Sequence, residues 1–140
     1  CANYDFTGSP LEGLVKPYTI VRKAGKRIGV IGVLTDIKDA VEMSIAKDFT
    51  YLEPAGIVNA LASELKDVKG CDMVICLSHL GYTEDKKLAS EICNVDLIVG
   101  GHSHTLLHKK QIVKDAEGND IVIVQNWKWG LHAGHLDVQF

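Results

Sequence analysis

The sequence lacks the features that mark several classes of protein. Its 140 residues contain no internal repeat and no low-complexity stretch, and the three prolines mark no linker. Even the most apolar stretches, residues 28–34 and 97–99, stop far short of the ~18 residues that a membrane-spanning helix needs. A hydrophobic share of 46%, a charged share of 24% and a mean hydropathy of +0.07 exclude a disordered, collagen-like or coiled-coil chain. One globular domain of ordinary size remains.

The chain also lacks an excess of charge of one sign. Lys and Arg total 15 against 18 Asp and Glu, a formal net charge of -3. The basic residues form no stripe, since 86–87 and 109–110 are isolated pairs. The sequence therefore predicts no nucleic-acid partner.

No Cys-x-x-Cys spacing occurs among the four cysteines, Cys1, Cys71, Cys76 and Cys93. Three of them lie in apolar segments, where cysteine behaves as a small hydrophobic residue. We expect free, buried thiols rather than a disulfide, which leaves the redox compartment open.

Hydrophobic patterning predicts an α/β fold, because helices alternate with buried strands after residue 53. A β-hairpin is expected over residues 18–33, and its second strand is apolar nearly throughout, as in a strand covered on both faces. Residues 35–52 have poor periodicity and are interpreted as a loop with one short helical turn. The remaining expected elements are strands at 72–77 and 95–99, a helix at 83–92, a hairpin of 111–114 and 121–125, and a last strand at 134–140.

An amphipathic helix is predicted to begin at Pro54 and to end near Gly70. Its apolar positions recur at helical spacing, and they are Val58, Leu61, Leu65 and Val68.

Two short histidine-containing segments follow the carboxyl ends of predicted strands, where open α/β sheets bind ligands. The first is Ser-His-Leu-Gly-Tyr, with His79, and the second is Gly-Gly-His-Ser-His-Thr, with His102 and His104. Residues two apart in extended backbone project to the same side, so His102 and His104 could reach one metal or two neighbouring metals. Neutral imidazole suits Zn, Mn, Fe, Co or Ni. The glycines would let the backbone leave the sheet sharply.

Each histidine also has a simpler interpretation. Taken alone, His79 is typical of a surface or hydrogen-bonded histidine, and we interpret His108, His132 and His135 as structural.

A two-metal centre needs a bridging carboxylate. Asp36, after the strand at 30–34, is the best candidate, but it lacks a histidine two places on.

At these motifs, together with Asn-Tyr-Asp-Phe-Thr-Gly at residues 3–8, the sequence resembles the 5'-nucleotidase branch of the calcineurin-like metallophosphoesterases. The resemblance covers essentially the whole chain. It implies an αββα sandwich, with a mixed sheet and flanking helices, and two divalent metal ions that hydrolyse phosphate esters, as in 5'-nucleotidases and 2',3'-cyclic-nucleotide phosphodiesterases. The matching positions make His79 and His102 ligands of one metal and His104 a ligand of the other. It also implies a periplasmic or extracellular location.

The family's earlier motifs, Asp-x-His, Gly-Asp and Gly-Asn-His-Glu, do not occur in this sequence, which also begins without Met. We therefore expect residues 1–140 to be part of a catalytic domain whose amino-terminal half and nucleotide-binding domain are absent. No catalytic residue lies on this piece, at most part of the metal site does, and it should be inactive alone. The alternative is a non-catalytic module that binds a transition metal or is completed by a partner. In either case an uncovered sheet face predicts self-association.

The sequence says least about which residues line the substrate site. Asn126, Trp127 and Trp129 are candidates for it, although we favour simple packing as the explanation of the two tryptophans.

Overall fold

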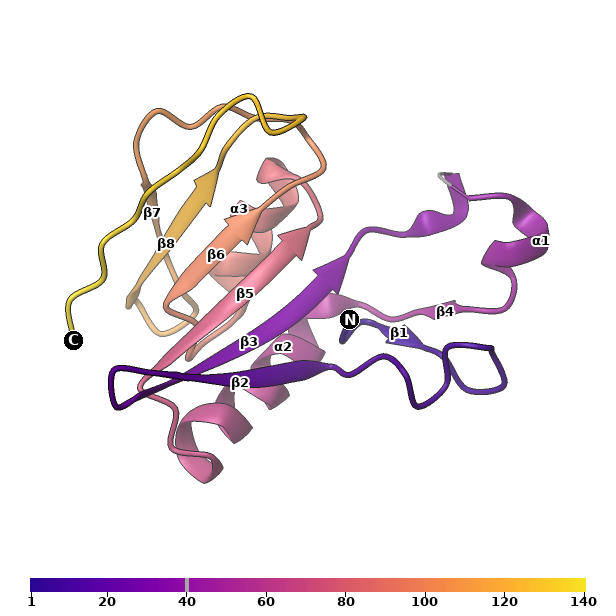
Figure 1. Cartoon of the computed structure of the whole chain (residues 1–140), viewed down its shortest axis with the longest axis horizontal. Helices are drawn as coiled ribbons and strands as arrows, with labels where there is room; N and C mark the ends of the chain where they lie inside the picture. Colours follow the sequence, from indigo (N-terminus) through magenta and orange to yellow (C-terminus); the bar gives the residue numbers. More distant parts are fainter. Residues whose placement is uncertain (40) are drawn as a thin grey trace.

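A six-stranded mixed sheet forms the centre of the molecule (Figure 1). The computed structural model of the chain describes residues 1–39 and 41–140. The strand order is β2-β3-β5-β6-β8-β7, in which the four central strands are parallel and each edge strand pairs antiparallel with its neighbour. The strands are β2 (Tyr18–Lys23), β3 (Lys26–Leu34), β5 (Met73–His79), β6 (Leu97–Gly100), β7 (Gln111–Lys114) and β8 (Asp120–Gln125).

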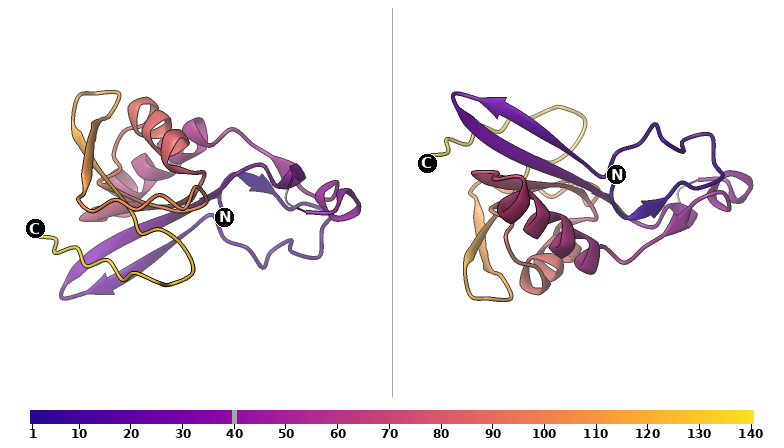
Figure 2. Two further views of the ribbon diagram at one scale, coloured as in Figure 1. Left: turned by 90° about the horizontal axis from the view of Figure 1, so that it is seen from above. Right: turned by 90° about the horizontal axis from the view of Figure 1, so that it is seen from below.

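Helices cover one face of this sheet. They are α2 (Pro54–Ser63), its π-helical continuation η2 (Glu64–Val68), and α3 (Tyr82–Glu91), and they lie on the same side of the strands (Figure 2). Leu65 of η2 is fully buried against the sheet, and a Cβ on Gly29 of β3 would lie 2.8 Å from its Cδ1. Glycine in the strand therefore lets the helix approach the sheet closely. The architecture confirms the predicted α/β class, with a mixed sheet and flanking helices.

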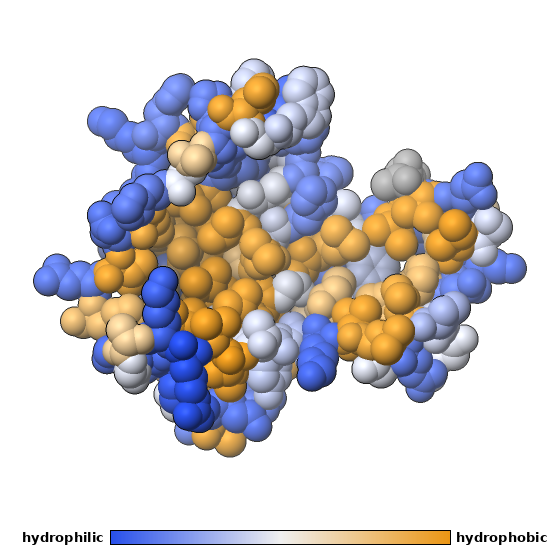
Figure 3. Space-filling model, viewed as in Figure 1, coloured by the Kyte–Doolittle hydropathy of each residue, from blue (hydrophilic) through white to orange (hydrophobic). Residues whose placement is uncertain are grey.

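The other face of the sheet is only partly covered. In Figure 3 apolar side chains spread across this face, which looks toward the viewer. Leu77 on β5 is 53% exposed, and Ile112 on β7 is 54% exposed. Leu97 and Val122, on neighbouring strands, line a hollow with residues 136–140, so the carboxyl-terminal segment crosses this face.

A small two-stranded sheet of β1 (Tyr4–Asp5) and β4 (Thr50–Tyr51) lies beside the main one. The side chain of Asn3 joins it to the end of β3, because its Nδ2 donates to Leu34 O at 2.7 Å and its Oδ1 accepts from Leu34 N at 2.9 Å. The stretch predicted as a loop with one helical turn holds η1 (Ile37–Asp39), α1 (Met43–Ala46) and β4. Its regular structure is thus somewhat richer than expected; residue 40 lies outside the described residues.

Most other expected elements are confirmed within about two residues, but two details are wrong. Residues 134–140 form no strand in the described chain, because they cross the open face, whereas ladder hydrogen bonds form along a sheet edge. Val68, predicted on the buried helix face, is 74% exposed. The wider turn of η2 rotates it away from the position that a regular α-helix would give it.

All four cysteines are free thiols, but only Cys71 and Cys76 are also buried as predicted, whereas Cys1 and Cys93 are partly exposed. Burial raises the pKa of the Cys76 thiol to about 12, so this group stays protonated in the core. Across the described residues, no helix has the length and apolar character needed to span a membrane.

Candidate metal site at the carboxyl edge of the sheet

The two histidine segments lie side by side because their strands are parallel neighbours. His79 is the last residue of β5, and the segment that carries His102 and His104 follows β6. The rings of His79 and His102 meet edge to face, with centroids 5.3 Å apart, and all three histidines are exposed. Partial burial, with the nearby His102 and His104, lowers the pKa of His79 and favours the neutral imidazole that binds metals.

The expectation that His102 and His104 lie in extended backbone is wrong. Their φ angles are +68° and +52°, in the left-handed region, and Ser103 N donates to Gly101 O at 2.9 Å. The segment therefore turns tightly on leaving the sheet, and the alternation of an extended strand does not set the directions of the two rings. Non-glycine residues in this region cost free energy and need support from their surroundings.

Gly100 and Gly101 do not make the sharp turn that the sequence predicts for them, since neither has a positive φ, but both are needed for close packing. A Cβ on Gly101 would lie 2.8 Å from Nδ1 of His79, and one on Gly100 would lie 2.4 Å from Oδ2 of Asp85. Any larger residue would push against the His79 ring or against a buried carboxyl group. Gly101 thus lets the second histidine segment lie against the first, and Gly100 lets β6 lie against Asp85 of α3.

Two buried polar residues near the site, Asp85 and Gln125, were missed from the sequence. The hydroxyl of Ser78 donates to Oδ1 of Asp85 at 2.5 Å and accepts from Leu80 N at 3.1 Å, which fixes the turn that follows His79. Burial raises the pKa of Asp85 to about 6. In the sequence, Asp85 is typical of a solvent-facing residue in the first turn of a helix, so nothing there indicates its burial. Gln125, by contrast, stands in register with buried apolar residues of β8, and this signal was available.

The histidines fit part of a metal site. Among residues 1–39 and 41–140, no three His, Cys, Asp or Glu side chains group closely enough to hold an ion. Imidazole nitrogens suit a transition metal, but the group contains no bridging carboxylate. These histidines could therefore supply some of the ligands of a metal centre, but they do not form a binuclear centre by themselves.

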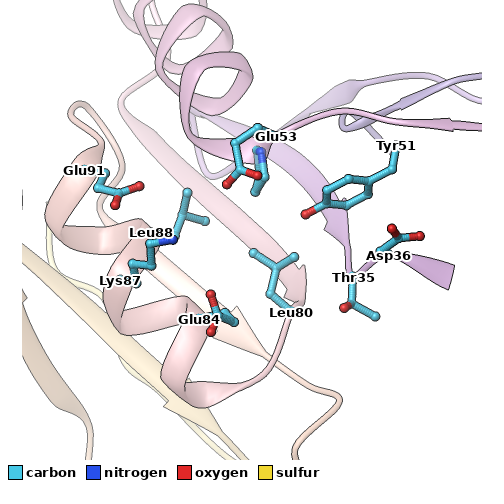
Figure 4. Close-up of a pocket in the computed structure, with 10 residues that line it drawn as sticks. Thr35, Asp36, Tyr51, Glu53, Leu80, Glu84, Lys87, Leu88 and Glu91 are labelled. Atoms are coloured by element: carbon cyan, nitrogen blue, oxygen red, sulfur yellow. The ribbon is translucent and has the colours of Figure 1, made fainter. Parts of the chain in front are cut away.

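Asp36, the candidate carboxylate, joins the histidines in no ligand group of the described residues, although its neighbour Thr35 donates its N–H to His79 O. It pairs with Lys38, at 3.3 Å, and lines a cavity of about 210 Å³ between α3 and the segment that leads into α2 (Figure 4). His79 instead lines a hollow of about 560 Å³ on the open face, with Leu77 and Val99. Asp36 is thus not grouped with the predicted ligands.

The other histidines lie outside this group, and their structural interpretation stays a prediction. His108 and His132 line a hollow beneath the carboxyl-terminal segment, and His135 contacts Asp137 at 3.0 Å. Trp127 N donates to Thr105 O at 3.0 Å, which places Trp127 beside the second histidine segment, next to Asn126. Trp129 is 78% exposed, so packing within the described residues does not explain it.

Known proteins share both the sequence and the fold. A probable 5'-nucleotidase of Treponema pallidum (strain Nichols) is 32% identical over 146 residues, which are 94% of this chain and 24% of that protein. The solved 5'-nucleotidase precursor of Thermus thermophilus is 38% identical with a TM-score of 0.84, covering 92% of this chain and 28% of that one. A calcineurin-like phosphoesterase, YfkN of Bacillus subtilis, shares the fold at 23% identity and a TM-score of 0.58, over 77% of this chain and 37% of that one.

No family model matches the sequence. The relatives and structural neighbours of this chain are nevertheless 5'-nucleotidases and, at the level of the fold, a calcineurin-like phosphoesterase. The chain is similar to 5'-nucleotidases in both sequence and fold, and it spans about a quarter of the length of the two just described.

Proposed function

We propose that this chain supplies the histidine part of a binuclear metal centre that hydrolyses nucleotide phosphate esters. The observation that carries the proposal is the contact of His79 with His102, 5.3 Å between ring centroids, at the carboxyl edge of a sheet shared with 5'-nucleotidases. On this proposal His79 and His102 hold one divalent metal and His104 holds the other. The remaining ligands, the bridging carboxylate among them, come from residues outside these 140.

The two metals, when bound, would supply Lewis-acid polarisation of the phosphoryl group. The residues of this chain hold and orient the imidazoles. Gly101 leaves room for the ring of His79, and the buried Ser78–Asp85 pair fixes the turn after it. The open hollow beside His79 leaves space for the rest of the centre.

Zinc and cobalt titration by calorimetry tests the ligand assignment. We expect the wild-type chain to bind these ions, and His79→Ala and His102→Ala to weaken binding at least about tenfold, since each removes a metal ligand. His135→Ala is the matched control, because this exposed histidine lies outside the group. Equal affinity in His102→Ala and in the wild type would overturn the assignment.

Hydrolysis of a nucleoside 5'-monophosphate tests the partial nature of the centre. We expect the chain alone to turn over far more slowly than the ~1–1000 per second typical of enzymes. Turnover in that range with no other chain present would contradict the proposal.

A second candidate function is a non-catalytic module that binds a transition metal or is completed by a partner chain. The absence of a three-residue ligand group among the described residues favours it. The coding sequence next to Cys1 distinguishes the two candidates. Adjoining Asp-x-His, Gly-Asp and Gly-Asn-His-Glu motifs would support the enzyme, and a stop codon there would support the module.

A further inference from the structure

Gln125 occupies a position where the pattern of its strand calls for an apolar residue. It is the last residue of β8, and Ile121 and Ile123, four and two places before it, are fully buried on the same face. Gln125 is itself only 3% exposed, and it is paired with Gly100 in the neighbouring strand. A buried amide must find hydrogen-bond partners, because leaving it unpaired costs free energy.

The partners of this amide are all in the second histidine segment. Oε1 of Gln125 accepts from Ser103 Oγ at 2.9 Å and from Thr105 N at 2.5 Å. Its Nε2 donates to Gly101 O at 2.9 Å. One side chain therefore binds residues 101, 103 and 105, which alternate with His102 and His104.

The same hydrogen-bond network reaches the first histidine segment. Ser103 Oγ, held by Gln125, also accepts from Tyr82 N at 3.0 Å, at the start of α3. This links the turn after His79 to the segment of His102 and His104. The close fit leaves no room at Gly100, where a Cβ would lie 3.0 Å from Nε2 of Gln125.

We propose that Gln125 is a positioning residue that sets the left-handed backbone of His102 and His104, and with it the placement of their imidazoles. Three hydrogen bonds from one rigid, buried amide offset the cost of two residues at positive φ. Hydrogen-bonded groups outside the ligand sphere orient metal-binding histidines in this way. The value of this placement for metal binding rests on the function proposed above.

NMR of the metal-free chain tests the positioning directly. Gln125→Met removes all three hydrogen bonds at similar volume, whereas Gln125→Glu keeps an acceptor for Ser103 and Thr105 and loses the donor to Gly101. We expect Gln125→Met to shift the ring resonances of His102 and His104 and to speed amide exchange at Thr105 at least about tenfold, with Gln125→Glu between it and the wild type. Gln111→Met is the matched control, because the side chain of Gln111 donates to Lys109 O, outside the segment.

Unchanged ring resonances and Thr105 exchange in Gln125→Met would overturn the inference. If that variant does not fold, Gln125→Glu and Ser103→Ala give the same readouts, and wild-type behaviour in both would overturn it equally.

Cobalt binding separates this inference from the proposed function. Visible absorption of bound Co²⁺ reports ligand geometry, and we expect Gln125→Glu to change the spectrum and to weaken affinity about 10- to 100-fold, with Gln111→Glu unchanged. A wild-type chain that binds no cobalt would contradict the metal function while leaving the NMR result to judge Gln125. A wild-type spectrum and affinity in Gln125→Glu would show that its donor to Gly101 does not position the imidazoles.

Discussion

The two faces of the central sheet are built from similar residues but end in different surroundings. On the helical face Ile31, Ile98 and Ile123 are fully buried. On the opposite face Leu77 and Ile112 are about half exposed, although strands of the same sheet carry them. The central strands are thus apolar on both faces, which is typical of parallel strands that are covered twice. In the described chain, complete cover comes only from α2, η2 and α3.

The largest difference between the faces should appear in stability. Leu65→Ala empties a fully buried site against β3, and we expect it to lower the free energy of unfolding by about 2–5 kcal/mol. Leu77→Ala removes the same atoms from a half-exposed site and should cost less than about 1 kcal/mol. Chemical denaturation of both variants measures the difference. Similar losses would mean that the open face is covered in solution.

Asp85 makes the helical face sensitive to pH. Burial raises its pKa to about 6, so the native state holds this proton more tightly than the unfolded chain does. The resulting stabilisation is fully present below about pH 4 and is lost as the pH rises through about 6. We expect the wild type to lose about 1–3 kcal/mol relative to Asp85→Asn over this range.

Unfolding free energies of the two chains at pH 4, 5, 6 and 7 measure this loss. Asp120→Asn is the control, since Asp120 is exposed and pairs with Lys114 at the far end of β8. If the free energy of unfolding depended on pH in the same way in the wild type and in Asp85→Asn, the raised pKa of Asp85 would be refuted.

The helical face was also the more predictable from sequence. Strand and helix positions follow from runs such as residues 73–77 and from the spacing of Val58 and Leu65, because their burial is decided by near neighbours. The structure of residues 134–140, where a strand was expected, could not be predicted in the same way. Whether this segment pairs with a sheet edge or crosses a sheet face depends on the surrounding tertiary structure. In the candidate site the three histidines stood out because of their motifs. The backbone that holds them did not, because the partners of Asp85 and Gln125 are set by the tertiary structure, although the polar Gln125 at a buried position of β8 was itself a signal.

A substitution on the open face of the sheet should change the stability of the chain least and its self-association most. An exposed apolar face larger than is usual for a monomer favours burial against a second copy of the chain. We expect sedimentation velocity to show concentration-dependent association of the wild type. Leu77→Lys, which places a charge in the middle of that face, should reduce it with little change in unfolding. Val68→Lys places the same charge on an apolar residue of the helical layer that is 74% exposed, and it should leave association unchanged. A wild-type chain that sediments as a monomer at all concentrations, or equal effects of the two lysines, would show that the carboxyl-terminal segment already protects the open face.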